Sequence, residues 1–142
     1  SIYQKIKKYF DVDNLNEIHF EKLTINDIKK LGLSTNKAKT IKNLSQLYLN
    51  QSMGDLTKLN NENLNNKLLS VFGIGPWSVD MFQIFCMGKL DVFSSKDAGL
   101  RLAMNLQKMV VKDSNFNIYE EYAQKWSPYK TIACLHLWKL VD

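Results

Sequence analysis

A glycine-rich turn and an aspartate that follows it are the residues of this sequence best suited to chemistry. The stretch Phe72–Asp80 reads FGIGPWSVD, and Asp97 follows in the segment DVFSSKD. Glycines allow positive φ angles and close approach to the backbone, and the amides at a helix N-terminus attract an anion. A carboxylate stabilises a sugar cation. This combination suits an enzyme that holds a DNA backbone and breaks a bond on one nucleotide.

Each of these residues also has a purely structural interpretation. Gly-Ile-Gly at 73–75 equally fits an ordinary turn that closes one helix and opens another. For Asp97 taken alone, the stronger interpretation is a helix cap, in which the carboxylate accepts hydrogen bonds from backbone amides. Trp77 and Trp138 lie at helical spacing and also fit a hydrophobic core, to which we assign Trp126.

The elements that position these residues are predicted to be helices. Pro76 suits the first turn of a helix that runs to about Met87, with Trp77, Met81, Ile84 and Phe85 available as its buried side. Asp97 opens the next helix, which runs to about Val110. We recognise no strand, repeat or linker, and predict one all-α domain over residues 1–142, with a helical hairpin at about 64–87. Other helices are expected near 2–10, 24–31, 34–48, 117–125 and 128–141.

Composition places the chain among ordinary globular proteins, with 45% hydrophobic and 23% charged residues over 142 positions. The net charge of +5 is compatible with a polyanionic partner, although a soluble surface explains it equally well. No apolar run approaches the roughly 18 residues that a membrane span needs. We expect a soluble intracellular chain, in the cytoplasm or nucleoid of a bacterium or archaeon and in the nucleus of a eukaryote.

The cysteines and histidines give no sign of a metal centre. Cys86 and Cys134 lack metal-ligand spacing and lie in apolar helical surroundings, so we predict two buried thiols and no disulfide. His19 and His136 have no second ligand at metal spacing and are interpreted as structural or solvated.

Four stretches become specific when their order and spacing are taken together. They are Leu31–Ala38 (LGLSTNKA), Gly73–Ser78 (GIGPWS), Asp91–Arg101 (DVFSSKDAGLR) and Trp126–Trp138 (WSPYKTIACLHLW). Through them the chain, from Leu31 to its C-terminus, resembles the helix-hairpin-helix DNA glycosylase superfamily, most closely its 3-methyladenine DNA glycosylase II (alkylation-repair) branch. The resemblance implies the fold of that superfamily.

The resemblance also implies roles for individual residues. Asp97 falls on the catalytic aspartate, which stabilises the positive charge that builds on the deoxyribose as the N-glycosidic bond breaks. Trp77 stands where bifunctional relatives have a Schiff-base lysine, so no lyase activity is expected. Trp77 and Trp138 would line the pocket for the flipped base, where electron-rich indole faces attract a cationic alkylpurine.

The hairpin and its surroundings complete this set of expectations. The resemblance implies that a DNA phosphate is held by Gly73, Ile74, Gly75, Trp77 and Ser78, and that the backbone carbonyls of Leu69, Val71 and Ile74 hold a monovalent cation, Na⁺ or K⁺. With only two cysteines, an iron–sulfur cluster of four cysteine ligands is not expected. No other cofactor is expected.

These points together predict a monofunctional DNA glycosylase of base-excision repair. It would hydrolyse the N-glycosidic bond of alkylated purines, such as 3-methyladenine and 7-methylguanine, flipped out of double-stranded DNA, and would act as a monomer. The alternatives are a non-catalytic helix-hairpin-helix DNA-binding module, or a glycosylase for other damaged or mismatched bases.

The chain departs from the family pattern in three places. Ala98 replaces an aromatic residue that follows the catalytic aspartate in some members, and Lys130 replaces an arginine. The upstream helices that supply a wedge residue find no match, and the first predicted helix (2–10) exposes a full apolar stripe. We therefore expect the fold to lack its N-terminal helices.

Overall fold

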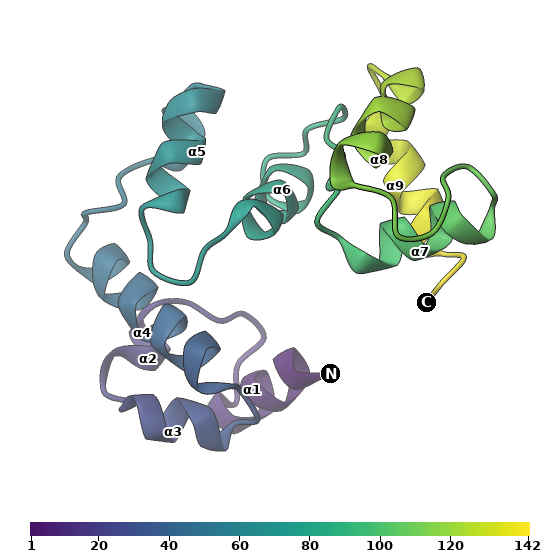
Figure 1. Cartoon of the computed structure of the whole chain (residues 1–142). Coiled ribbons are helices and arrows are strands. Elements are labelled where there is room, and N and C mark those ends of the chain that lie inside the picture. Colours follow the sequence, from purple (N-terminus) through teal and green to yellow (C-terminus); the bar gives the residue numbers. More distant parts are fainter. The chain divides into compact units, whose positions relative to one another are not determined.

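The computed structural model describes all 142 residues as helices, turns and loops, with no β-strand (Figure 1). The all-α prediction is therefore confirmed. The chain divides into two compact units, Ser1–Ile74 (unit 1) and Gly75–Asp142 (unit 2). The boundary lies within the predicted hairpin, so the first helix of the hairpin belongs to unit 1 and the second to unit 2.

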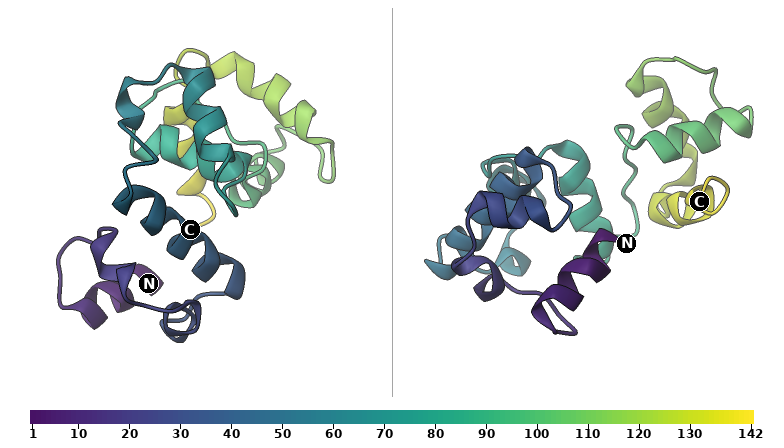
Figure 2. Two further views of the ribbon diagram at one scale, coloured as in Figure 1. Left: turned by 90° about the vertical axis from the view of Figure 1, so that its left-hand side faces the viewer. Right: turned by 90° about the horizontal axis from the view of Figure 1, so that it is seen from below.

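Unit 1 is built around its longest helix, with two short helices lying against it (Figures 1 and 2). The side chains of Ile6, Phe20, Ile28 and Ala38 form its buried core. The Nζ atom of Lys42 donates to the carbonyl oxygen of Phe20 at 3.1 Å, which ties the long helix to its neighbour. The helices of unit 1 are α1 (Ile2–Phe10), α2 (Ile18–Glu21), α3 (Ile25–Lys30), α4 (Thr35–Leu49) and α5 (Asn61–Leu69), with a 3₁₀ turn η1 (Leu56–Lys58).

Capping residues begin several of these helices where the sequence predicts. Thr24 and Asp27 form a capping box at α3, in which each side chain accepts from the backbone amide of the other. The Ser34 hydroxyl accepts from the amide of Lys37 at the start of α4. The apolar stripe of α1 is only partly covered, because Ile6 is buried whereas Tyr9 is exposed.

Unit 2 places α7 beside α9 (Figures 1 and 2). Its buried core is formed by Leu100, Ala103, Met104, Val110, Tyr119, Cys134 and Leu137. Trp126 and Trp138 are partly buried and pack against this core, which fits the assignment of Trp126 to it. The helices of unit 2 are α6 (Pro76–Phe85), α7 (Ala98–Leu106), α8 (Phe116–Ala123) and α9 (Lys130–Trp138), with a 3₁₀ turn η2 (Gln124–Trp126).

Three details of unit 2 differ from the prediction. Helix α6 buries Val79 and Ile84, whereas Trp77 and Phe85 keep 46% and 63% of their surface exposed, so the expected buried side is wrong for those two. Cys86 is exposed, and only Cys134 is a buried thiol. Helix α7 ends before Val110, because Lys108 adopts a left-handed conformation with φ of 57°.

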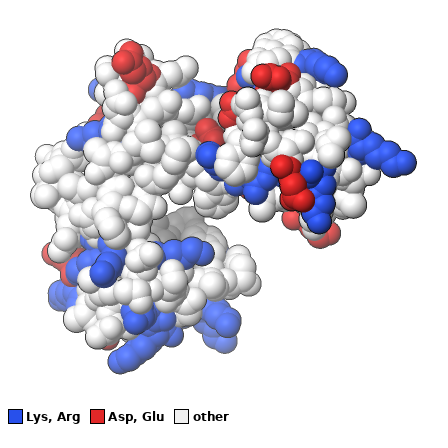
Figure 3. All heavy atoms as spheres, viewed as in Figure 1, with Lys and Arg blue, Asp and Glu red and all other residues white.

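Charge is distributed unevenly along the chain. In unit 1 lysines outnumber acidic residues, whereas the two kinds nearly balance in unit 2. Lys and Arg side chains gather over the lower part of unit 1 in Figure 3, while both signs are interspersed over the visible face of unit 2. None of the helices combines the length and the apolar character required to cross a bilayer.

Candidate active site

The loop that carries Asp97 is fixed to the start of α9. Asp91 accepts a hydrogen bond from the Ser127 hydroxyl at 2.8 Å, and its carboxylate lies 3.7 Å from the Nζ atom of Lys130. The hydroxyl of Thr131 donates to the carbonyl oxygen of Lys89 at 2.7 Å and accepts from the amide of Val92 at 3.1 Å. These bonds hold the segment between α6 and α7 against α9. The backbone that leads to Asp97 is therefore fixed in position.

Asp97 itself is held from three sides. The Nε1 atom of Trp77 donates to its Oδ2 at 2.7 Å, and the Nε1 atom of Trp138 donates to its Oδ1 at 3.0 Å. The amide of Leu100 donates to the same Oδ1 at 2.8 Å, which makes Asp97 the N-cap of α7. The cap interpretation is therefore confirmed. The structure also brings three of the predicted residues, Asp97, Trp77 and Trp138, into one cluster.

Hydrogen bonding keeps this carboxylate ionised although it is largely buried. Asp97 keeps only 9% of its surface exposed. Burial alone would raise its pKa, but the bonds from Trp77, Leu100 and Trp138 outweigh that effect and hold the pKa below its usual value. At neutral pH Asp97 therefore carries a fixed negative charge between two indole N–H groups.

A glycine leaves room for one of these indoles. A Cβ atom added at Gly99 would lie 3.2 Å from Oδ1 of Asp97 and 3.5 Å from Cδ1 of Trp138. The first distance is tighter than most Cβ contacts and the second is ordinary van der Waals contact, so a side chain at this position would press on Asp97 and pack against Trp138. Gly99 therefore allows Trp138 to approach Asp97 closely.

Aromatic surface surrounds the cluster. The rings of Phe85 and Trp138 are stacked, with centroids 5.8 Å apart and an interplanar angle of 28°. Phe85 and Trp77 are both substantially exposed. Electron-rich aromatic faces thus border a negative carboxylate, an arrangement that favours a planar cation. Phe85 was not predicted as a site residue, because its place on α6 resembles that of any buried helical aromatic.

A second carboxylate, Asp80, lies on α6 one turn after Trp77. Burial raises its pKa; the neighbouring Ser94 hydroxyl partly offsets this, and the negative charge of Glu120 adds to it. Burial also raises the pKa of the Cys134 thiol to about 12, with contributions from the charges of Asp97 and Asp80. Cys134 is therefore a neutral core residue and no nucleophile.

The glycine turn has the backbone that the motif predicts. Gly73 has φ of 82°, and a Cβ atom at this position would lie 1.8 Å from Oγ1 of Thr40, so no side chain fits unless Thr40 moves. Gly75 is the N-cap of α6, Pro76 follows, and no side chain caps the N-terminal amides of this helix. Because no side chain of the protein caps these amides, they can donate hydrogen bonds to a bound anion.

The structure gives few observations that bear on the predicted cation site and on the two histidines. The carbonyl oxygen of Val71 accepts the amide of Ile74 at 3.1 Å, which is compatible with the turn expected around Leu69, Val71 and Ile74. His19 accepts from the amide of Asn16 at 3.0 Å, in keeping with a structural role. No group of three or more His, Cys, Asp or Glu side chains is placed to hold a metal ion.

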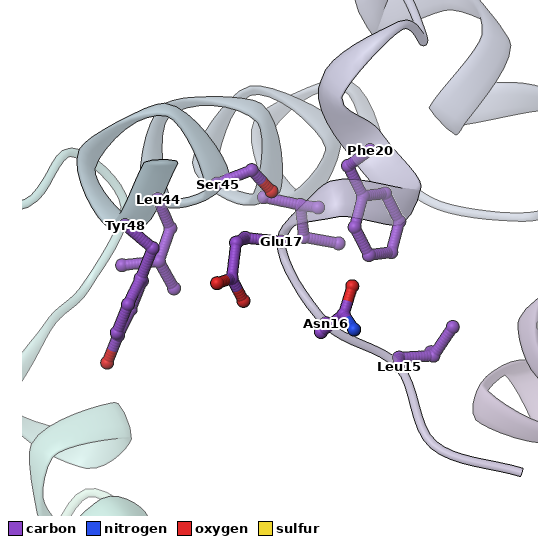
Figure 4. Close-up of a pocket in the computed structure, with 8 residues that line it drawn as sticks. Leu15, Asn16, Glu17, Phe20, Leu44, Ser45 and Tyr48 are labelled. Carbon is purple, nitrogen blue, oxygen red and sulfur yellow. The ribbon is translucent and has the colours of Figure 1, made fainter. Parts of the chain in front are cut away.

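Unit 1 has a hollow of its own, and none of the predicted site residues lines it. Its volume is about 270 Å³, and its walls are mainly apolar. Figure 4 shows Leu44 and Tyr48 of α4 on one side, with Glu17 and Asn16 on the other. The carboxylate of Glu17 is its only acidic group.

Comparison with known proteins gives a consistent result. No protein-family model matches the chain. A DNA-3-methyladenine glycosylase of Saccharomyces cerevisiae is 30% identical over 82% of this chain and 50% of its own length. The crystal structure of a DNA-3-methyladenine glycosidase from Bacillus halodurans matches 97% of this chain and 64% of its own, with a TM-score of 0.72 and 25% identity. The chain is a homologue of DNA-3-methyladenine glycosylases.

A further structure supports the fold of these homologues. The 3-methyladenine DNA glycosylase Mag1 of Schizosaccharomyces pombe, solved in complex with abasic DNA, covers 97% of this chain with a TM-score of 0.84 and 21% identity. The predicted helix-hairpin-helix glycosylase fold and the predicted resemblance are therefore confirmed. The chain spans about half the length of the curated relatives it matches.

Proposed function

We propose that this protein is a monofunctional DNA glycosylase that hydrolyses the N-glycosidic bond of alkylated purines in double-stranded DNA. The observation that carries the proposal is the ionised carboxylate of Asp97, held between the indole N–H groups of Trp77 and Trp138. Homology to DNA-3-methyladenine glycosylases supports the same activity.

The proposed reaction needs one fixed negative charge. When the bond between C1′ and the base nitrogen breaks, its electron pair leaves with the base and positive charge develops on C1′ and O4′. Asp97 stabilises this charge, and a water molecule then adds to C1′ and gives up a proton to the solvent. The indole donors of Trp77 and Trp138, together with the backbone amides of Leu100 and Gly99, hold the carboxylate in one orientation, in which it would face the sugar.

The choice of base follows from the aromatic surroundings. A purine alkylated at N3 or N7 is already cationic and leaves without a dedicated general acid. The exposed ring of Trp77 and the stacked pair of Phe85 and Trp138 attract such a base through cation–π contacts, each worth about 0.5–2 kcal/mol. Position 77 holds tryptophan and no lysine, so no Schiff base forms there.

The N-terminus of α6 is the proposed grip on the DNA backbone. Its amides lack a side-chain cap, and Trp77, on the first turn of the same helix, touches Asp97. A phosphate bound at this helix end would therefore lie close to the reacting nucleotide. Backbone contacts of this kind hold DNA without reading its sequence. We further propose that the protein acts as a monomer and that Leu69, Val71 and Ile74 hold a monovalent cation through their carbonyls.

The test is release of free 3-methyladenine and 7-methylguanine from methylated duplex DNA. Wild type and Asp11→Asn, a matched change at an exposed aspartate that ends α1, should release both bases. Asp97→Asn should lose at least about a hundredfold in rate, because it removes the charge at the transition state. Its DNA affinity should be unchanged or higher.

Two results would contradict the proposal. Turnover that survives in Asp97→Asn would show that Asp97 is not the catalytic group. An absence of base release from wild type, with intact folding and DNA binding, would favour a non-catalytic helix-hairpin-helix module. A panel that includes 8-oxoguanine separates the remaining alternative, since a pocket for cationic bases should ignore that neutral lesion.

A further inference from the structure

A pocket in unit 2 begins on α7, one residue after Asp97. Its volume is about 300 Å³. One face of α7 forms one wall, and the segment that leads into α8 forms the other. The lining residues are Ala98, Arg101, Leu102, Asn105, Lys112, Asp113, Ser114, Phe116 and Tyr119.

Arg101, the only arginine of the chain, is held in place at this pocket. Its Nη1 atom donates to the carbonyl oxygen of Ser95 at 2.7 Å, and its guanidinium carbon lies 4.8 Å from the ring centroid of Phe116. No carboxylate lies within ion-pair distance of it. A guanidinium has five N–H donors, and this arrangement uses one. Four donors therefore remain, on a group that is already ordered.

The neighbouring charges make the pocket positive. Lys112 lines it, and the Nζ atom of Lys96 lies 3.9 Å from the Phe116 centroid; neither lysine forms an ion pair. Asp113 is the single carboxylate in the lining. Two cations, Arg101 and Lys96, thus lie against the Phe116 ring, and a third, Lys112, lines the same pocket, against one carboxylate in the lining.

An amide donor completes the set. The hydroxyl of Tyr119 donates to Oδ1 of Asn105 at 2.9 Å. This bond orients the carboxamide so that its NH₂ group is left as a donor. Guanidinium, ammonium and amide donors converge on one pocket, which is the chemistry that recognises a phosphate.

We propose that this pocket binds a phosphodiester of the DNA strand that carries the target nucleotide. The choice of DNA rests on the function proposed above, whereas the phosphate chemistry rests on the pocket itself. Arg101 follows Asp97 by four residues, or about 6 Å along the helix, which matches the rise of about two nucleotides on one strand. The pocket would hold the backbone beside the reacting nucleotide, and Arg101, Lys112 and Asn105 would be positioning residues.

Two charge-removing variants and one matched control test the proposal. Lys112→Gln removes a cation whose side chain makes no hydrogen bond or ion pair, so folding should be unaffected. Arg101→Gln removes the ordered guanidinium group. Lys139→Gln removes the same charge at the end of α9, outside the pocket. Affinity for a duplex with an abasic-site analogue is measured across a range of KCl concentrations, and circular dichroism verifies folding.

The expected result is a several-fold loss of affinity in both pocket variants. The slope of log affinity against log salt should fall by about one in each, because one phosphate contact is lost. Lys139→Gln should bind as wild type does. Pocket variants that match Lys139→Gln in affinity and slope would overturn the proposal.

Two further measurements separate related outcomes. Inorganic phosphate is titrated into the protein while the NMR signals of Arg101 and Lys112 are followed. If phosphate saturates the pocket without any effect on DNA affinity, the proposal that the pocket binds DNA would be overturned. Base release is measured on the same variants. If wild type releases no base while its DNA affinity still depends on the pocket residues, the proposed glycosylase activity would be refuted and the proposed phosphodiester site would be supported.

Discussion

Replacing Trp138 with phenylalanine should remove one hydrogen bond from Asp97 and keep an aromatic ring beside it. The Nε1 atom of Trp138 lies 3.0 Å from Oδ1, and the shorter bond from Trp77 is left intact. A hydrogen bond to a charged group contributes about 1.5–3 kcal/mol, which corresponds to about a ten- to hundredfold change in rate or equilibrium. The change acts on the ionised form of the carboxylate, so its effect depends on pH.

The direction of the pH effect follows from the pKa of Asp97. The folded protein lowers this pKa, so the ionised carboxylate stabilises the fold above the unfolded value, and that stabilisation is lost as the pH falls through the folded value. Without the Trp138 donor, fewer hydrogen bonds offset the effect of burial, so the pKa of Asp97 rises. The acid limb of base release should therefore move to higher pH, with a large loss of rate on the acid side and a small one near pH 8.

Initial rates of base release between about pH 3 and 8 measure this shift, because the lowered pKa of Asp97 places the acid limb at low pH. Trp126→Phe is the matched control, because Trp126 packs on the same core without a bond to Asp97. In the Asp97→Asn background, Trp138→Phe should add no further pH dependence. An acid limb that stays in place, or that moves equally in Trp126→Phe, would refute the role of the indole donor.

Two glycine substitutions test the geometry. Gly99→Ala should reduce base release while leaving the unfolding free energy unchanged or raised by up to about 1 kcal/mol, because alanine favours helix while its Cβ presses on Oδ1 of Asp97. Parallel losses of stability and rate would contradict this. Gly73→Ala should lower the unfolding free energy by about 1–3 kcal/mol more than Gly54→Ala in denaturant titrations, because both have positive φ but only Gly73 meets Thr40; equal losses would show that the contact is harmless.

Local signals in the sequence predicted the helix starts well. Thr24, Ser34 and Asp97 each begin a helix as N-cap, because a side-chain oxygen followed by free amides is a short-range arrangement that sequence alone specifies. The ends of helices were less predictable. Helix α7 ends at Leu106 because Lys108 turns left-handed, and a lysine in that conformation has no sequence signature.

The contacts of Asp97 could not be derived from sequence spacing. Its indole partners are 20 and 41 residues away, and their approach depends on how the loop before α7 is fixed to α9 through Asp91 and Thr131. Periodicity predicted the burial of Ile84 on α6 but was wrong for Trp77 and Phe85. An apolar helix offers several candidate faces, and tertiary packing selected Val79 and Ile84 and left Phe85 and Cys86 exposed.

The two interpretations of Asp97, helix cap and catalytic charge, describe the same atoms. Oδ1 accepts the amide of Leu100 and the indole of Trp138, so the bond that begins α7 also aims the carboxylate. Asparagine caps a helix about as well as aspartate, whereas alanine costs about 1 kcal/mol at this position. Asp97→Asn therefore keeps the start of α7 and removes the charge, while Asp97→Ala removes both. A rate that falls equally in the two variants, with a larger loss of stability in the second, would assign the loss of activity to the charge.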